Sequence, residues 1–113
     1  MSKSFQVTRL ENARNLTTVT IEVLENGGFE MSDWSIGAFA DEVYGSDVDR
    51  IIKLTPEAVD KLSASLTIFP GPKAAESCAN YLTEKYKGYN RALTMIRDLC
   101  DQHGVQYTEE FWP

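Results

Sequence analysis

The sequence predicts an α+β fold in which a small antiparallel sheet is covered on one face by three C-terminal helices. Three observations predict this class. A run of β-branched residues is followed by a glycine turn, apolar residues recur at helical spacing in the second half, and the 113 residues are 42% apolar and 25% charged. A chain of this length buries enough surface to fold as one domain, residues 1–113, without disulfides or metals.

The first half is predicted to form a β-hairpin. Within residues 17–25, alternation places Val19, Ile21 and Val23 on one face of a strand. Asn26-Gly27-Gly28 follows, and because asparagine and glycine tolerate the positive φ of a tight turn, residues 29–37 should return antiparallel.

Three other segments complete the predicted first half. Residues 48–55 are β-branched and bounded by turn residues, which is typical of a third strand. Residues 38–44 predict a short helix that ends at Gly45. Residues 1–16 are mixed in polarity and predict only a short strand or a lead-in segment.

The second half predicts three successive helices. Thr55-Pro56-Glu57 supplies a hydroxyl cap, a proline at the first helical position and an acid in the first turn. An apolar stripe that reaches Phe69 extends this helix to the break at Pro70-Gly71-Pro72. Further helices are expected over residues 74–87 and 90–103, and the aromatic tail is expected to dock as a last strand.

Acidic residues are concentrated in one part of the chain. Between Asn15 and Asp49 there are eight acids and no lysine or arginine, whereas the rest holds nine acids and all eleven basic residues. The net charge of −6 disfavours direct contact with nucleic acid or an anionic membrane. The asymmetry indicates a charged face, which either keeps the sheet solvated and guards its edge or docks a basic protein surface that otherwise holds nucleic-acid phosphates.

The docking interpretation assigns partner binding to the acids of this segment and to one aromatic residue. Trp34 is a candidate anchor, although a tryptophan on a hairpin is also typical of a core. The interpretation requires the acidic side chains to gather in one outward patch. The candidate set is Glu22, Glu30, Asp33, Trp34, Asp41, Glu42, Asp47 and Asp49.

The residue types disfavour catalysis and metal binding. His103 is the single histidine, so two- and three-histidine metal sites are excluded, and only Cys100 with His103 offers a thiol beside an imidazole. Cys100 falls on the apolar stripe of its predicted helix, where a thiol acts as a small hydrophobe. The acids at residues 41–49 lack the order of a calcium loop, and no glycine-rich phosphate loop is present. We therefore expect no enzyme activity, no metal and no cofactor.

The chain is expected to be cytoplasmic. Two cysteines are too few for a secreted disulfide scaffold, and residues 1–5 lack the apolar core of a signal peptide. No window approaches the roughly 18 consecutive apolar residues of a membrane-spanning helix.

Four segments together resemble a family of small uncharacterised bacterial and phage proteins. They are the Asn-Gly-Gly hairpin, W-S-I-G-x-F-A-D-E-V-Y-G, the strand leading into L-T-P-E-A, and the closing H-G-V-Q-Y-x-E-E-F-W. This resemblance covers residues 17–66 and 98–112 and implies no function. By type, a short, acidic chain without catalytic motifs is similar to phage anti-defence proteins such as anti-CRISPRs, many of which occlude nucleic-acid sites. That similarity implies an inhibitor that acts in the host cytoplasm.

Two other classes of binding protein share these features. An immunity or antitoxin-type protein would bind one cognate toxin, and neighbouring genes would distinguish it from an inhibitor. A self-associating structural subunit, for example a homodimer, would join through a sheet edge or the Phe111-Trp112 tail. Sedimentation at two concentrations would reveal it.

Overall fold

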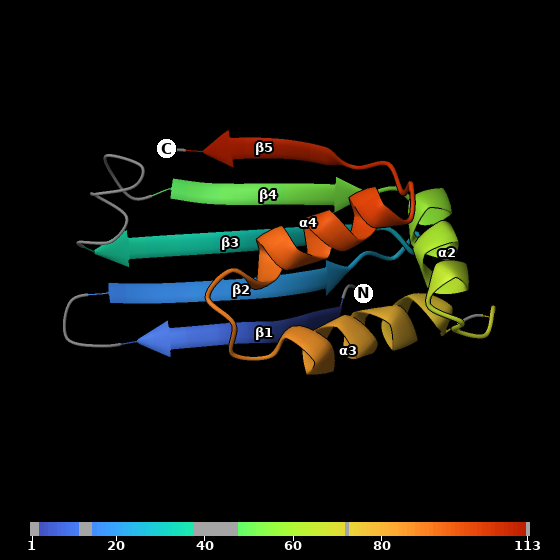
Figure 1. The fold of residues 1–113 in the computed structure, drawn as a ribbon, viewed down its shortest axis with the longest axis horizontal. Coiled ribbons are helices and arrows are strands. Elements are labelled where there is room, and N and C mark those ends of the chain that lie inside the picture. Colours follow the sequence, from blue (N-terminus) through green and yellow to red (C-terminus); the bar gives the residue numbers. More distant parts are fainter. Residues whose placement is uncertain (1–2, 12–14, 38–47, 72, 113) are drawn as a thin grey trace.

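The sheet and helices belong to an α+β fold in the computed structural model, which describes residues 3–11, 15–37, 48–71 and 73–112. The sheet has five strands in chain order, and each neighbouring pair is antiparallel (Figure 1). Segments near both ends add edge strands to the expected hairpin and third strand: the aromatic tail forms the last strand that was expected, and the N-terminal segment forms a nine-residue strand in place of a short strand or lead-in. The strands are β1 (Lys3–Glu11), β2 (Asn15–Val23), β3 (Phe29–Gly37), β4 (Val48–Leu54) and β5 (Thr108–Trp112).

A bulge explains why β1 was hard to predict. The register with β2 shifts between Gln6 and Thr8, and Val7 and Thr8 are both buried although they are consecutive. A bulge adds one residue to one strand, so the two-residue alternation that marks a strand in sequence is lost. The bulge also contacts the segment between the last two helices, because the Thr8 hydroxyl donates a hydrogen bond to the Tyr89 carbonyl at 2.8 Å.

The predicted hairpin of β2 and β3 is confirmed. Val19, Ile21 and Val23 are all buried, as their alternation indicated. In the connecting turn Gly27 has a φ of 91°, which favours glycine, and the Gly28 amide donates to Asn26 Oδ1 at 2.9 Å.

The described part of the chain contains three helices: α2 (Pro56–Ser65), α3 (Ala74–Tyr86) and α4 (Ala92–Gln102). The predicted start of α2 is confirmed, since Thr55 Oγ1 accepts a hydrogen bond from the Ala58 amide at 3.1 Å. The short helix expected over residues 38–44 lies outside the described residues.

The predicted end of α2 was wrong. The helix ends at Ser65, and Phe69, assigned to its apolar stripe, is 89% exposed. Thr67 takes a φ of 58°, and the Ile68 amide donates to the Ser63 carbonyl at 2.9 Å. This is the hydrogen bond of a Schellman closure, which satisfies a terminal carbonyl and turns the chain before the prolines.

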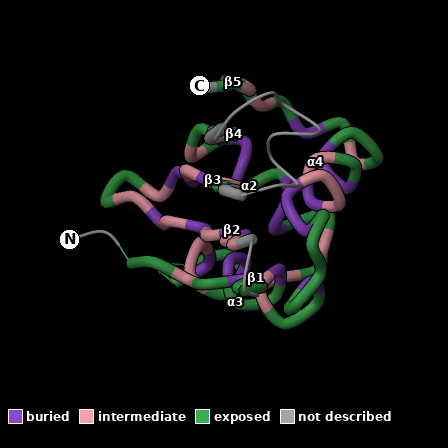
Figure 2. The backbone as a smooth tube through the Cα atoms, turned by 90° about the vertical axis from the view of Figure 1, so that its left-hand side faces the viewer, coloured by how far each residue is buried: buried purple, intermediate pink, exposed green. Residues whose placement is uncertain are grey.

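The core lies between the sheet and the helices. In Figure 1, α3 and α4 lie in front of the sheet and α2 lies beyond one end of it. The edge strand β5 has only exposed or half-buried residues among those whose burial is described, whereas α4 has buried residues on the side that faces the strands (Figure 2). No helix among the described residues is long and apolar enough to cross a membrane. The largest fully buried side chains include Ile21, Phe29, Met31, Ile52, Leu62, Leu82, Leu93 and Ile96.

Candidate functional site

The strand positions that alternate with the buried ones form the surface that we call the open face. Its described members are all exposed or half-buried, and most are small or polar. Successive side chains of a strand point to opposite faces of the sheet, so these residues share one surface. They are Ser4, Gln6, Arg9, Thr18, Thr20, Glu22, Glu30, Ser32, Trp34, Ile51, Lys53, Thr108 and Glu110.

Two of the predicted acids are direct neighbours on this surface. Glu22 of β2 and Glu30 of β3 are cross-strand partners, and both are half-buried. No salt bridge joins either carboxylate to the part of the chain that the structure describes. Like charges at directly opposed positions destabilise a sheet, so the folded protein retains a repulsion that a bound cation would relieve.

One lysine borders this acid pair. Lys53 of β4 is the cross-strand partner of Glu30 on its other side, but its ammonium lies 3.8 Å from a Glu110 carboxylate oxygen on β5. Both side chains of this ion pair are nearly half exposed, so it contributes little to stability. Trp34, 38% exposed, stands further along β3 on the same surface.

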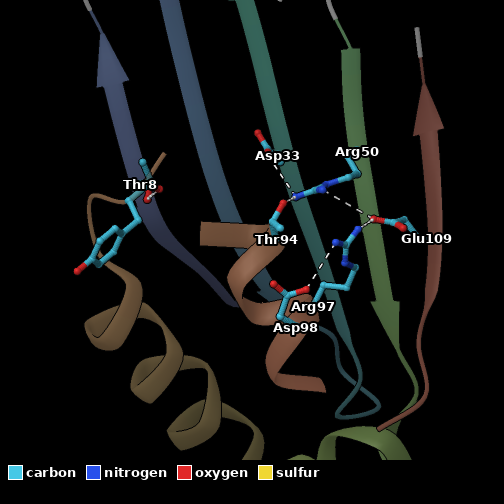
Figure 3. A network of polar contacts seen from close by, with 8 residues as sticks. Thr8, Asp33, Arg50, Thr94, Arg97, Asp98 and Glu109 are labelled. Carbon is cyan, nitrogen blue, oxygen red and sulfur yellow. Dashed lines mark hydrogen bonds and ion pairs between the residues drawn. The ribbon is translucent and has the colours of Figure 1, made fainter. Parts of the chain in front are cut away.

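Asp33 lies on the opposite face of the sheet from Glu22 and Glu30. A carboxylate oxygen of Asp33 lies 3.6 Å from the buried Arg50 guanidinium, which also donates to Thr94 Oγ1 of α4 at 2.8 Å (Figure 3). A carboxylate oxygen of Glu109, on β5, forms ion pairs with the guanidinium groups of Arg50, at 3.9 Å, and of Arg97 of α4, at 3.5 Å. This network joins β3, β4 and β5 to α4, and it makes Asp33 a structural residue.

The described acids of the predicted set therefore do not gather in one patch. Glu22, Glu30 and Trp34 share the open face, while Asp33 points toward α4. Asp49 is paired in register with Trp34, and its side chain is not described. Asp41, Glu42 and Asp47 lie outside the described residues.

The cysteine side chains lie in the core. Burial, the largest cause, raises the pKa of Cys100 to about 12 and that of Cys78 to about 11. At neutral pH both thiols are protonated, and a thiolate is what a cysteine nucleophile requires. Within the described ranges, no group of three or more His, Cys, Asp or Glu side chains could hold a metal ion.

Sequence reasoning missed Lys53, Arg50 and Glu110. The signal for the first two was present, because in residues 48–54 alternation separates Lys53 from Ile52 and places Arg50 on the core side. Glu110 could not be assigned from local sequence, because its position depends on β5 pairing with β4 across more than fifty residues. Comparison with protein-family models, with curated proteins and with solved structures finds no match for this chain.

Proposed function

We propose that the protein is a non-enzymatic binding protein whose open face, through Glu22 and Glu30, docks on a basic segment of a partner. The observation that carries the proposal is the cross-strand pair of Glu22 and Glu30, which no salt bridge joins to a cation within the described ranges. A lysine or arginine from a partner would end the repulsion between them and gain two attractions at once. Such acids raise the association rate and the selectivity more than the affinity.

The rest of the open face suits this role. Threonine, serine and glutamine side chains offer hydroxyl and amide groups beside the acids, and Trp34 offers an apolar body with an indole donor. A polar surface with one partly exposed aromatic residue matches the polar rim and aromatic anchor that are common in interfaces.

The test is a titration with a basic probe, a pentapeptide of lysines. Glu22→Gln/Glu30→Gln removes the pair, and Asp60→Asn/Glu84→Gln removes two exposed acids from helices as a control with the same change in net charge. If each acid contributes about 0.7 kcal/mol, the first variant weakens binding about tenfold. The control should retain most of the affinity. If both variants bound the peptide equally weakly, the change in net charge alone would explain the effect and the proposal would be rejected.

The sheet edge gives less support to self-association. Within the described residues β5 pairs only with β4, and Phe111 is 57% exposed, so an edge is available. Antiparallel pairing of two β5 strands would, however, bring Glu109 and Glu110 of both copies together, and like charges on an edge strand oppose such pairing. A monomer at micromolar concentration in sedimentation is the expected result.

A further inference from the structure

A cavity lies at the end of the sheet where the chain enters α2. It has a volume of about 450 Å³ and is formed by the β2–β3 turn, the β4–α2 junction and the segment before β5. Its wall is largely apolar, with Leu24, Phe29, Leu54, Pro56 and Tyr107 among the lining residues. A concave site of this size and polarity is typical of a place that receives a ligand or an anchor side chain.

The backbone around the cavity is held in place by local contacts. The Leu24 amide donates to the Gly28 carbonyl at 2.9 Å, and the Gly28 amide donates to Asn26 Oδ1. A Cβ at Gly28 would lie 2.8 Å from the Leu54 carbonyl oxygen, so only glycine allows the turn to approach β4 this closely. The hydrogen-bonded turn and its close approach to β4 therefore fix one side of the cavity.

The cavity adjoins the acid pair of the open face. Lys53 and Thr108 belong to the open face and line the cavity, and Lys53 is the cross-strand partner of Glu30. Glu22 stands one strand further from it. The apolar hollow and the two acids, which no salt bridge joins to the described residues, thus lie toward the same end of the open face.

We propose that this cavity receives one bulky apolar side chain of the partner, flanked in the partner's sequence by the lysines or arginines that contact Glu22 and Glu30. The inference rests on the proposed function and specifies its partner as a basic segment with an apolar anchor. An anionic ligand is disfavoured because the adjacent acids repel it and because the ammonium of the lining residue Lys53 is already paired with Glu110 at 3.8 Å. Anchor side chains that fill a pocket supply most of the energy of many interfaces, whereas exposed charges supply selectivity.

The experiment compares two probes, Lys-Lys-Trp-Lys-Lys and Lys-Lys-Gly-Lys-Lys, both capped, in titrations followed by amide chemical shifts. The tryptophan peptide should bind at least tenfold more tightly and should shift the amides of Gly28, Thr55 and Thr108 around the cavity. Gln106→Trp places a bulky group at an exposed lining position and should abolish this advantage. Gln102→Trp makes the same change at an exposed position of α4 away from the cavity and should preserve it.

The outcomes separate this inference from the proposed function. Equal binding of the two peptides, weakened by Glu22→Gln/Glu30→Gln, would overturn the anchor and leave the acidic docking face. An advantage that survives Gln106→Trp, or shifts that avoid the cavity, would also overturn the anchor. Binding of neither peptide would overturn both proposals. If N-acetyltryptophan amide alone bound as tightly as the tryptophan peptide, the cavity would be a small-molecule site and the peptide assignment would be wrong.

Discussion

Glu22→Gln tests whether the opposed acids of the open face repel each other in the folded protein. Glu22 faces Glu30 on β3 and Ser4 on β1, so the substitution removes a like-charge contact without breaking an ion pair. Two unit charges about 6 Å apart in a medium as polar as water repel by about 0.7 kcal/mol. Measured cross-strand effects have the same size, up to about 1 kcal/mol. For a domain of this length, that gain corresponds to an increase in Tm of about 3 °C.

Thermal and urea unfolding, followed by circular dichroism, measure the gain. Glu84→Gln, at an exposed position of α3, is the matched control. The screening length falls from about 30 Å at 0.01 M salt to about 3 Å at 1 M salt. The stability of Glu22→Gln should therefore exceed that of the control at low salt and approach it at high salt. A variant no more stable than the control at low salt would refute the repulsion, and so would a gain that salt leaves unchanged.

Three further predictions concern stability. Arg50→Met should lower the free energy of unfolding in urea by about 2–3 kcal/mol, because the partly exposed acids Asp33 and Glu109 lose the cation that they share. A loss below about 0.5 kcal/mol, the size expected for a surface substitution, would show that the network is not stabilising. Thr67→Gly should raise stability by about 0.5–1 kcal/mol, because a β-branched residue at positive φ is strained and glycine is not; a loss would contradict this. Unfolded thiols ionise from their ordinary pKa of 9.0, whereas burial raises the pKa of Cys78 to about 11 and of Cys100 to about 12. The folded state thus holds protons that the unfolded state releases, so stability should fall as pH rises above 9, and this fall should be shallower in Cys78→Ala/Cys100→Ala.

Local patterns predicted the elements whose signals lie within a few residues. The turn at Asn26-Gly27-Gly28 and the Thr55 cap act through their own side chains and backbone, and both were assigned correctly. The end of α2 was missed because Thr67 occupies the left-handed position that usually holds glycine, and a threonine does not indicate a helix end in the sequence. The length of β1 was missed because the bulge at Val7 interrupts the alternation.

The candidate site was only partly predictable, because charge concentrated along a chain is not charge concentrated in space. Residues 29–34 contain two of the candidate acids, yet Glu30 and Asp33 are an odd number of residues apart in one strand and must face opposite sides. Counting positions within β3 would have separated them. Other charges on the sheet, among them those of Lys53, Arg50 and Glu109, have placements that depend on pairing between segments distant in sequence.

Lys53 determines how much negative charge the open face presents. An ammonium is a single point charge on a flexible stem, so its contact with Glu110 leaves Glu30 incompletely compensated. That ion pair is nearly half exposed and contributes less than about 1 kcal/mol, so a partner that displaces Lys53 meets little resistance. Under the proposed function, displacement of Lys53 by a basic segment would widen the acidic surface from Glu22 and Glu30 toward Glu110 of β5. Such binding would exchange one weak ion pair for several, and its gain would lie mainly in the rate and selectivity of association.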